Sequence, residues 1–286
     1  MSVVVVTDST ASLDPEVAAR RGVTVVPLQV IVDDDALVEG EPGATPGAVA
    51  QALRDKRSVS TSRPTPETFA ATYARLAEEG ATAVLSIHLS SDVSGTFESA
   101  QVAARRTDIP VTCVDTRQVG VATGYAALSA QDVIDGGGSV EEATAAAHRR
   151  AAEAVTYLYV DTLEYLRRGG RIGSAAALLG GALAVKPLLG IEEGVVATLE
   201  KVRTSARAIA RLEALAAEAA GERAVEVTIA HLDSPDRAAE MADRVREELA
   251  EQLADREVRF TELGAVLGAH VGPGMLAICV APLLTD

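Results

Sequence analysis

The chain has 286 residues, of which 48% are apolar and 23% are charged, and its formal net charge is −15. A chain of this length and composition can form two globular domains, and its negative charge argues against binding to nucleic acid or to anionic lipid headgroups. Aromatic residues make up only 3% of the chain and tryptophan is absent, so platforms for stacking nucleic-acid bases are not expected.

The cysteines and the apolar segments indicate a cytoplasmic protein. Cys113 and Cys279 each lie in an apolar, strand-like run, which is typical of reduced thiols in a core. Met1–Val6 leads directly into an expected strand without a basic start, so we do not expect a signal peptide. The weakly polar run Ser174–Ile191 contains a lysine, a proline and three glycines; it predicts a buried helical segment, and no integral membrane association is expected.

The first half of the chain alternates strands with helices. The expected strands are Val3–Val6, Val23–Val32, Ala83–Leu89 and Val111–Asp115. The expected helices are one beginning at Pro15 after the N-cap Asp14, then Pro66–Glu79, about Gly95–Arg106, Gly120–Asp135 and Glu141–Ala154. This alternation predicts a mostly parallel sheet with helices on both faces.

The second half has fewer strands and two long helices. The expected strands are Thr156–Val160, Ala197–Val202, Val225–Leu232, Val258–Glu262 and Met275–Ala281. The expected helices are Thr204–Ala220 and Pro235–Leu253. We therefore predict an α/β protein of two domains, residues 1–154 and a smaller α/β sandwich of residues 155–286.

A loop rich in hydroxyl groups follows the expected strand Ala83–Leu89. This loop, Ser90–Phe97, reads S-S-D-V-S-G-T-F and precedes an expected helix. Ligands of open α/β sheets bind beyond the carboxyl ends of the strands, and free N–H groups at a helix start favour anions. Because Gly95 lets a ligand approach the backbone, the segment Ser94–Thr96 predicts a carboxylate or phosphate site. The alternative is that these hydroxyls only cap the helix and close turns.

Three other segments could serve an anion. Ser60–Thr68 holds a second cluster of hydroxyls stiffened by prolines, and His270 comes just before a rigid Gly-Pro-Gly turn. Tyr165–Ser174 carries three arginines in five residues, and Arg203 and Arg207 follow. Arginine suits phosphate, so this basic segment predicts a docking or phosphate-handling surface. The alternatives are a structural histidine and a solvated basic turn.

Seven motifs, taken in order, resemble those of the DegV family of bacterial fatty-acid-binding proteins over nearly the whole chain. They are D-S-T-A-S-L at 8–13, T-S-R-P-T-P at 61–66, S-S-D-V-S-G-T-F at 90–97, V-D-T-R at 114–117, Y-L-R-R-G-G-R-I at 165–172, K-P-L-L at 186–189 and H-V-G-P-G at 270–274. The resemblance implies two α/β domains and one long-chain fatty acid in an interior tunnel, with its carboxylate between the domains. The residues that the resemblance assigns to the carboxylate are Thr61, Ser62, Ser94, Gly95, Thr96 and His270.

The resemblance also implies a carrier with a partner enzyme. The chain would need no cofactor and would present the fatty-acid carboxylate to a separate ATP-dependent fatty acid kinase, which forms an acyl phosphate. Arg171 and Arg203 would then help phosphotransfer or kinase docking. Arg63 stands where the family more often has an uncharged polar residue; it is expected to point outward, with contact to the headgroup as the alternative.

Two other functions stay open. The chain could bind or sense another amphipathic carboxylic acid. It could also be a weak serine esterase in which His270 activates Ser94, although the string G-x-S-x-G of many serine hydrolases does not occur in the sequence.

Overall fold

The computed structural model describes residues 2–178 and 186–284. The chain forms two compact units, the first made of Met1–Gln29 with Ser62–Ala152 and the second of Val30–Thr61 with Glu153–Asp286. Residues 30–61, which the sequence pattern predicts to lie in the first domain, belong to the second unit in the structure.

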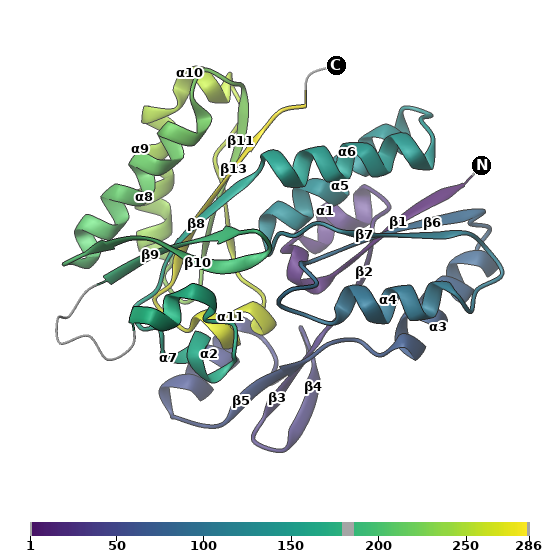
Figure 1. Cartoon of the computed structure of the whole chain (residues 1–286), viewed down its shortest axis with the longest axis horizontal. Helices are drawn as coiled ribbons and strands as arrows, with labels where there is room; N and C mark the ends of the chain where they lie inside the picture. Colours follow the sequence, from purple (N-terminus) through teal and green to yellow (C-terminus); the bar gives the residue numbers. More distant parts are fainter. Residues whose placement is uncertain (1, 179–185, 285–286) are drawn as a thin grey trace. The chain divides into compact units, whose positions relative to one another are not determined.

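The first unit is built on a parallel sheet of four strands in the order β2-β1-β6-β7 (Figure 1). The strands are β1 (Val3–Asp8), β2 (Thr24–Val26), β6 (Ala83–His88) and β7 (Val111–Asp115). In the central pair Val3 lies beside Ala83 and Val6 beside Ser86, which brings the ends of β1 and β6 to the same edge of the sheet. The predicted parallel sheet is confirmed.

Helices cover both faces of this sheet. One face is covered by α3 (Pro66–Glu78) and α4 (Thr96–Ala104). Phe69 and Tyr73 of α3 are fully buried in the hydrophobic core between these helices and the sheet. Alanines of α5 (Val121–Asp135) and α6 (Val140–Glu153) cover the other face. A short helix α1 (Pro15–Arg20) follows the N-cap Asp14, whose carboxylate accepts hydrogen bonds from the N–H groups of residues 16 and 17. This helix start is the one that the Asp-Pro pair predicts.

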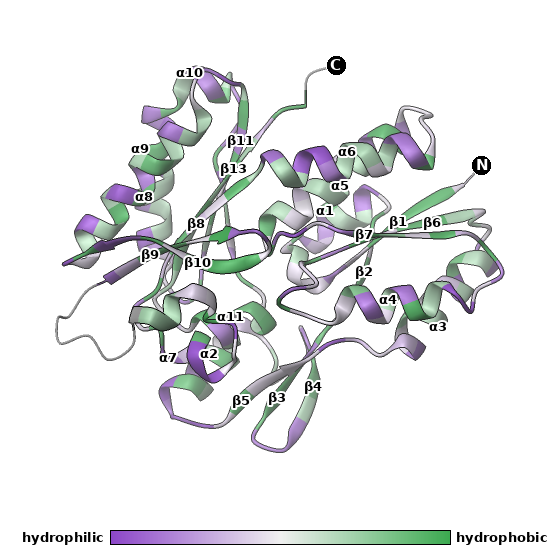
Figure 2. Ribbon diagram, viewed as in Figure 1, coloured by the Kyte–Doolittle hydropathy of each residue, from purple (hydrophilic) through white to green (hydrophobic). Residues whose placement is uncertain are grey.

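The second unit contains a sheet of six strands in the order β10-β9-β8-β13-β11-β12. The strands are β8 (Val155–Tyr159), β9 (Lys186–Glu192), β10 (Val195–Val202), β11 (Val225–His231), β12 (Arg259–Glu262) and β13 (Leu276–Pro282). All neighbours are antiparallel except β11 and β12. The helices α8 (Ser205–Ala220) and α9 (Pro235–Glu248) pack on this sheet and form a hydrophobic core with it. In Figure 2 hydrophobic and hydrophilic bands alternate along both helices, as expected of amphipathic helices.

Residues 30–61 add a small sheet and a helix to the second unit. The sheet has the order β4-β3-β5 and consists of β3 (Gln29–Val32), β4 (Asp35–Val38) and β5 (Val59–Ser62). Helix α2 (Pro46–Arg54) contacts the short helix α11 (Ala265–Val271), and Arg54 forms an ion pair with Asp233. The remaining short elements are α7 (Glu164–Arg168), α10 (Ala250–Leu253) and the 3₁₀ helices η1 (Ser9–Ala11) and η2 (Gly173–Leu178).

Two predicted elements are each divided in the structure. The strand predicted over Val23–Val32 is two strands of different sheets, β2 and β3, separated at Pro27, which has no N–H for a ladder. The helix predicted over Pro235–Leu253 ends at Glu248, and α10 follows after Leu249.

The prediction for Ser174–Ile191 is also corrected. The beginning of this run is a 3₁₀ helix that ends at Leu178, and the run from Lys186 onward is strand β9 and not helix. The middle of the predicted helix, residues 179–185, lies outside the described residues. Among the described residues no helix combines the length and the apolar character needed to cross a membrane.

Candidate functional site

The hydroxyl loop of the first unit leads from β6 into α4. Gly95 is the N-cap of α4, and Ser94 Oγ accepts a long hydrogen bond from Thr96 N at 3.4 Å and lies 2.9 Å from Thr96 Oγ1. At the other end of the loop Ser91 donates to the carboxylate of Asp115, with an oxygen–oxygen distance of 2.5 Å. The loop is therefore fastened to the end of β7 and presents half-buried hydroxyl and backbone groups at a helix start, where anions are favoured.

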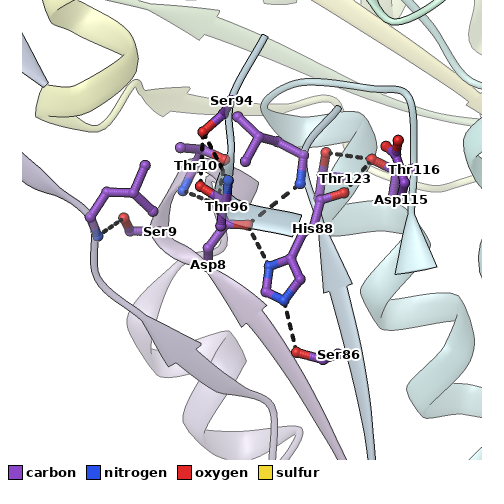
Figure 3. A network of polar contacts seen from close by, with 12 residues as sticks. Asp8, Ser9, Thr10, Ser86, His88, Ser94, Thr96, Asp115, Thr116 and Thr123 are labelled. Atoms are coloured by element: carbon purple, nitrogen blue, oxygen red, sulfur yellow. Dashed lines mark hydrogen bonds and ion pairs between the residues drawn. The ribbon is translucent and has the colours of Figure 1, made fainter. Parts of the chain in front are cut away.

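A buried polar network lies beneath this loop (Figure 3). The Asp8 carboxylate accepts hydrogen bonds from Thr10 Oγ1 at 2.5 Å and from Thr10 N at 3.1 Å, and it lies 2.8 Å from His88 Nδ1. The other ring nitrogen of His88 lies 2.7 Å from Ser86 Oγ, which in turn lies 2.8 Å from the hydroxyl of Tyr73. A buried carboxylate needs several donors, and this network supplies them while joining the ends of β1 and β6.

The order Asp8–His88–Ser86 resembles that of a hydrolytic triad, but its position does not suit catalysis. Asp8, Ser86 and His88 are all fully buried, and Ser86 lies within strand β6 against Tyr73. A nucleophile must reach its substrate, so this network is a structural one that fixes the base of the hydroxyl loop. This network was not predicted from the sequence, although Ser86 and His88 stand at alternate positions of an otherwise apolar strand and so share one face of the sheet.

In the second unit, Thr61 and His270 form a pair. Thr61 lies on β5 and His270 in the last turn of α11, and Thr61 Oγ1 lies 2.9 Å from His270 Nε2. Burial, and to a smaller extent the positive charge of Arg171, lower the pKa of His270 to about 4. The imidazole is therefore neutral near pH 7. Its Nδ1 is buried and has no hydrogen-bond partner among the described residues.

The position of His270 depends on two motifs that interlock. A Cβ atom on Gly169 would overlap the His270 ring, and one on Gly272 would overlap the ring of Tyr165. Gly272 also has φ of 76°, a conformation that glycine adopts at little cost. Each motif thus contributes a glycine that leaves space for a ring of the other motif: Gly169 for His270, and Gly272 for Tyr165.

Comparison with known proteins identifies the family. The family model described as "Uncharacterised protein, DegV family" matches residues 2–283. The chain belongs to the DegV family. It is 52% identical over 279 residues to a DegV domain-containing protein of Streptomyces coelicolor, with 98% of each chain covered.

Solved structures of the DegV family have the same fold. A fatty-acid-binding DegV family protein from Thermus thermophilus matches with a TM-score of 0.89 and 34% identity, covering 99% of this chain and 100% of its own. DegV of Bacillus subtilis, described as a fatty acid binding protein, matches with a TM-score of 0.88 and 32% identity at the same coverage. The α/β fold class predicted from the sequence is confirmed.

In the basic segment Tyr165–Ser174 of this DegV-family chain, two of the three arginines are already paired with an acidic side chain. Arg167 and Arg168 both bind the carboxylate of Glu164, at 2.7 and 2.8 Å. Arg171 follows α7, is exposed, and donates to the carbonyl of Gly169 at 2.6 Å. Arg171 therefore stands out among the three arginines of this segment, because its charge also acts on His270.

The other predicted residues lie as follows. Ser62 ends β5, is half-buried, and donates a 3.3 Å hydrogen bond to the carbonyl of Arg63. Arg203 is exposed between β10 and the N-cap Thr204 of α8, and no described residue forms a hydrogen bond or ion pair with its guanidinium. The structure thus groups Thr61, His270 and Arg171 in the second unit.

Within residues 2–178 and 186–284, no cluster of three or more His, Cys, Asp and Glu side chains could hold a metal ion.

Proposed function

We propose that the protein binds a long-chain fatty acid and that Thr61, Ser94 and His270 bind its carboxylate, supported by Ser62 and by backbone N–H groups at Gly95 and Thr96. The observation that carries this proposal is the likeness, over 99% of the chain, to two DegV proteins described as fatty acid binding. The hydroxyl groups at the start of α4 and the Thr61–His270 pair, each within its own unit, support it by their chemistry.

The chemistry of these groups suits a carboxylate that is removed from water. Such a carboxylate needs several hydrogen-bond donors or it becomes protonated. Hydroxyls, a neutral imidazole and amides at a helix start can donate without forming a tight ion pair with the oxygen. The apolar tail would supply most of the affinity, since about a dozen methylenes at about 0.8 kcal/mol each give roughly 10 kcal/mol before the costs of binding.

Binding measurements on delipidated protein test this proposal. Ser94→Ala and His270→Ala should each weaken palmitate binding by about 1 kcal/mol or more, the scale of a lost charge-assisted hydrogen bond. Thr72→Ala is the matched control, because its hydroxyl bonds only within its own helix, to the carbonyl of Thr68. Wild-type affinity in both site variants would refute the assigned headgroup site.

A different amphipathic acid is the second candidate for the same groups. Neutral donors at a helix start bind any carboxylate, so the headgroup alone does not select a fatty acid. Competition by short-chain, long-chain and aromatic acids separates the two. A long-chain preference supports the fatty acid, and an aromatic or short-chain preference supports the alternative.

We further propose that the bound carboxylate is presented to a separate fatty acid kinase in the cytoplasm. In that step a carboxylate oxygen attacks the γ-phosphorus of ATP, the bond to the ADP oxygen breaks, and an acyl phosphate and ADP form. Arg171 and the exposed Arg203 are suited to a phosphate because guanidinium groups donate several hydrogen bonds at once. The two free cysteines are consistent with a reducing compartment.

The kinase proposal has its own test. With ATP, palmitate and a partner kinase, Arg171→Ala should bind palmitate almost normally and form little acyl phosphate. Arg246→Ala, an exposed arginine of α9 that is paired with Asp243, controls for the change in net charge. Acyl phosphate formed at the wild-type rate by the Arg171 variant would remove this residue from the step. Formation without any kinase would mean that the chain itself is an enzyme.

A further inference from the structure

The guanidinium of Arg63 lies against the backbone of Gly95. A Cβ atom on Gly95 would overlap Arg63 Nη1 and would lie 2.7 Å from Cζ and 3.0 Å from Cδ, so the arginine fills the space that a side chain would take. Both residues belong to the first unit, although 32 positions (95 − 63) separate them. Arg63 is exposed, as expected of a side chain that points outward, and its charged end also covers the N-cap of α4.

The Arg63 guanidinium is unpaired within the part of the chain that the structure describes. Among the residues that the structure describes, none forms a hydrogen bond or an ion pair with the Arg63 guanidinium. A guanidinium that lies at a helix start is repelled by the partial positive charge of the free N–H groups there. In a chain of net charge −15, the absence of an acidic partner at this place is notable.

The acidic groups on the neighbouring segments do not neutralise it. Glu67 of α3 is paired with Arg106 at 3.4 Å, and Asp92 of the hydroxyl loop lies 3.7 Å from Arg117. Glu98, in the first turn of α4, is exposed. A positive charge next to Ser94 is thus left for a ligand.

We propose that Arg63 determines the charge specificity of the headgroup site: its guanidinium at Gly95 favours anionic lipids over neutral ones. This inference rests on the proposed binding of a fatty acid through Ser94. The guanidinium adds a full positive charge and several N–H donors to a site whose other donors are neutral, and such donors bind anions more strongly than neutral oxygens. An alkyl phosphate, with more charge than a carboxylate, gains more from it than a fatty acid does.

The test compares three ligands with the same C16 chain: palmitate, 1-hexadecanol and monohexadecyl phosphate. Equilibrium dialysis of the full-length, delipidated protein gives the affinity of each. Arg63→Gln should weaken palmitate about tenfold and monohexadecyl phosphate at least as much, while hexadecanol changes less than about twofold. Arg63→Lys should restore part of the lost affinity for the two anions, because it restores the charge without the planar fork.

Arg105→Gln is the matched control, since Arg105 is the exposed C-cap of the same helix and its loss changes the net charge equally. This control should leave all three affinities unchanged.

A second measurement is the carboxyl pKa of bound [1-¹³C]palmitate. This pKa should be higher in Arg63→Gln than in the wild type, since the lost cation no longer stabilises the ionised form.

The outcomes are distinguishable. An unchanged Arg63→Gln variant, or one that loses hexadecanol as strongly as palmitate, would overturn the role of Arg63 in charge specificity while leaving fatty-acid binding intact. A wild-type protein that binds none of the three ligands would overturn the proposed function, and the inference with it.

Discussion

At the scale of single residues, His270 has the most perturbed environment of the predicted binding residues. Its pKa of about 4 means that the imidazole is neutral in the folded protein at pH values where an unfolded chain begins to protonate it. Between about pH 6.5 and pH 4 the unfolded chain therefore binds more protons at this residue than the folded chain does. The contribution of His270 to stability is accordingly lost as the pH falls through that window.

The charge of Arg171 gives a direct prediction about His270. Arg171→Ala removes a cation that disfavours the protonated imidazole, so the pKa of His270 should rise above about 4. It should stay below the ordinary value because burial, the larger cause, is unchanged. An NMR titration of the His270 ring, assigned with His270→Gln, measures the shift. An unchanged pKa would mean that Arg171 does not act on His270.

Some residue roles could be predicted from the sequence and others could not. Ser94, Gly95 and Thr96 stand together in one short segment at a helix start, and local sequence is enough to place them there. The contact between His88 and Asp8 joins residues that are 80 positions apart in the chain. The close approach of Arg63 to Gly95 likewise depends on the tertiary fold and not on local sequence. Such contacts leave no periodic pattern in the sequence.

At the scale of elements, helix α11 depends on a cap from far along the chain. Its N-cap is Gly264, which has no side chain to accept a hydrogen bond, and Glu39 Oε1 accepts from Val266 N at 2.7 Å instead. This contact spans 227 positions, so a sequence pattern could not have fixed where the helix begins. The local pairs Asp14-Pro15 and Thr65-Pro66, in contrast, predicted the starts of α1 and α3.

The cap predicts an effect on His270, which lies in the last turn of α11. Glu39→Ala should lower the free energy of unfolding by about 1 kcal/mol, the usual cost of a lost N-terminal cap, and should weaken fatty-acid binding as well. Urea unfolding and palmitate dialysis measure the two effects. Asp14→Ala, which removes the N-cap of α1 in the first unit, is the control; it should lower stability to a similar degree and leave palmitate binding unchanged. If the Glu39 variant bound palmitate like the wild type, α11 would hold His270 without this cap.

At the scale of the whole molecule, the sequence predicted the fold class but not the membership of every segment. Alternation of strands and helices was enough for a parallel sheet with two helical layers in the first unit. Residues 30–61 stand in the chain between the two segments of the first unit and yet join the second, through contacts of α2 with α11 and of Glu39 with Val266. These long-range contacts decide which unit contains Thr61.

Mass spectrometry of the organic extract of natively purified protein tests fatty-acid binding without any added ligand. We expect about one long-chain fatty acid per chain, and its length and saturation would show the preference within the lipids of the host. A clean extract from a protein that also takes up no added palmitate would contradict fatty-acid binding. The groups around Ser94 and His270 would then have to serve another acid.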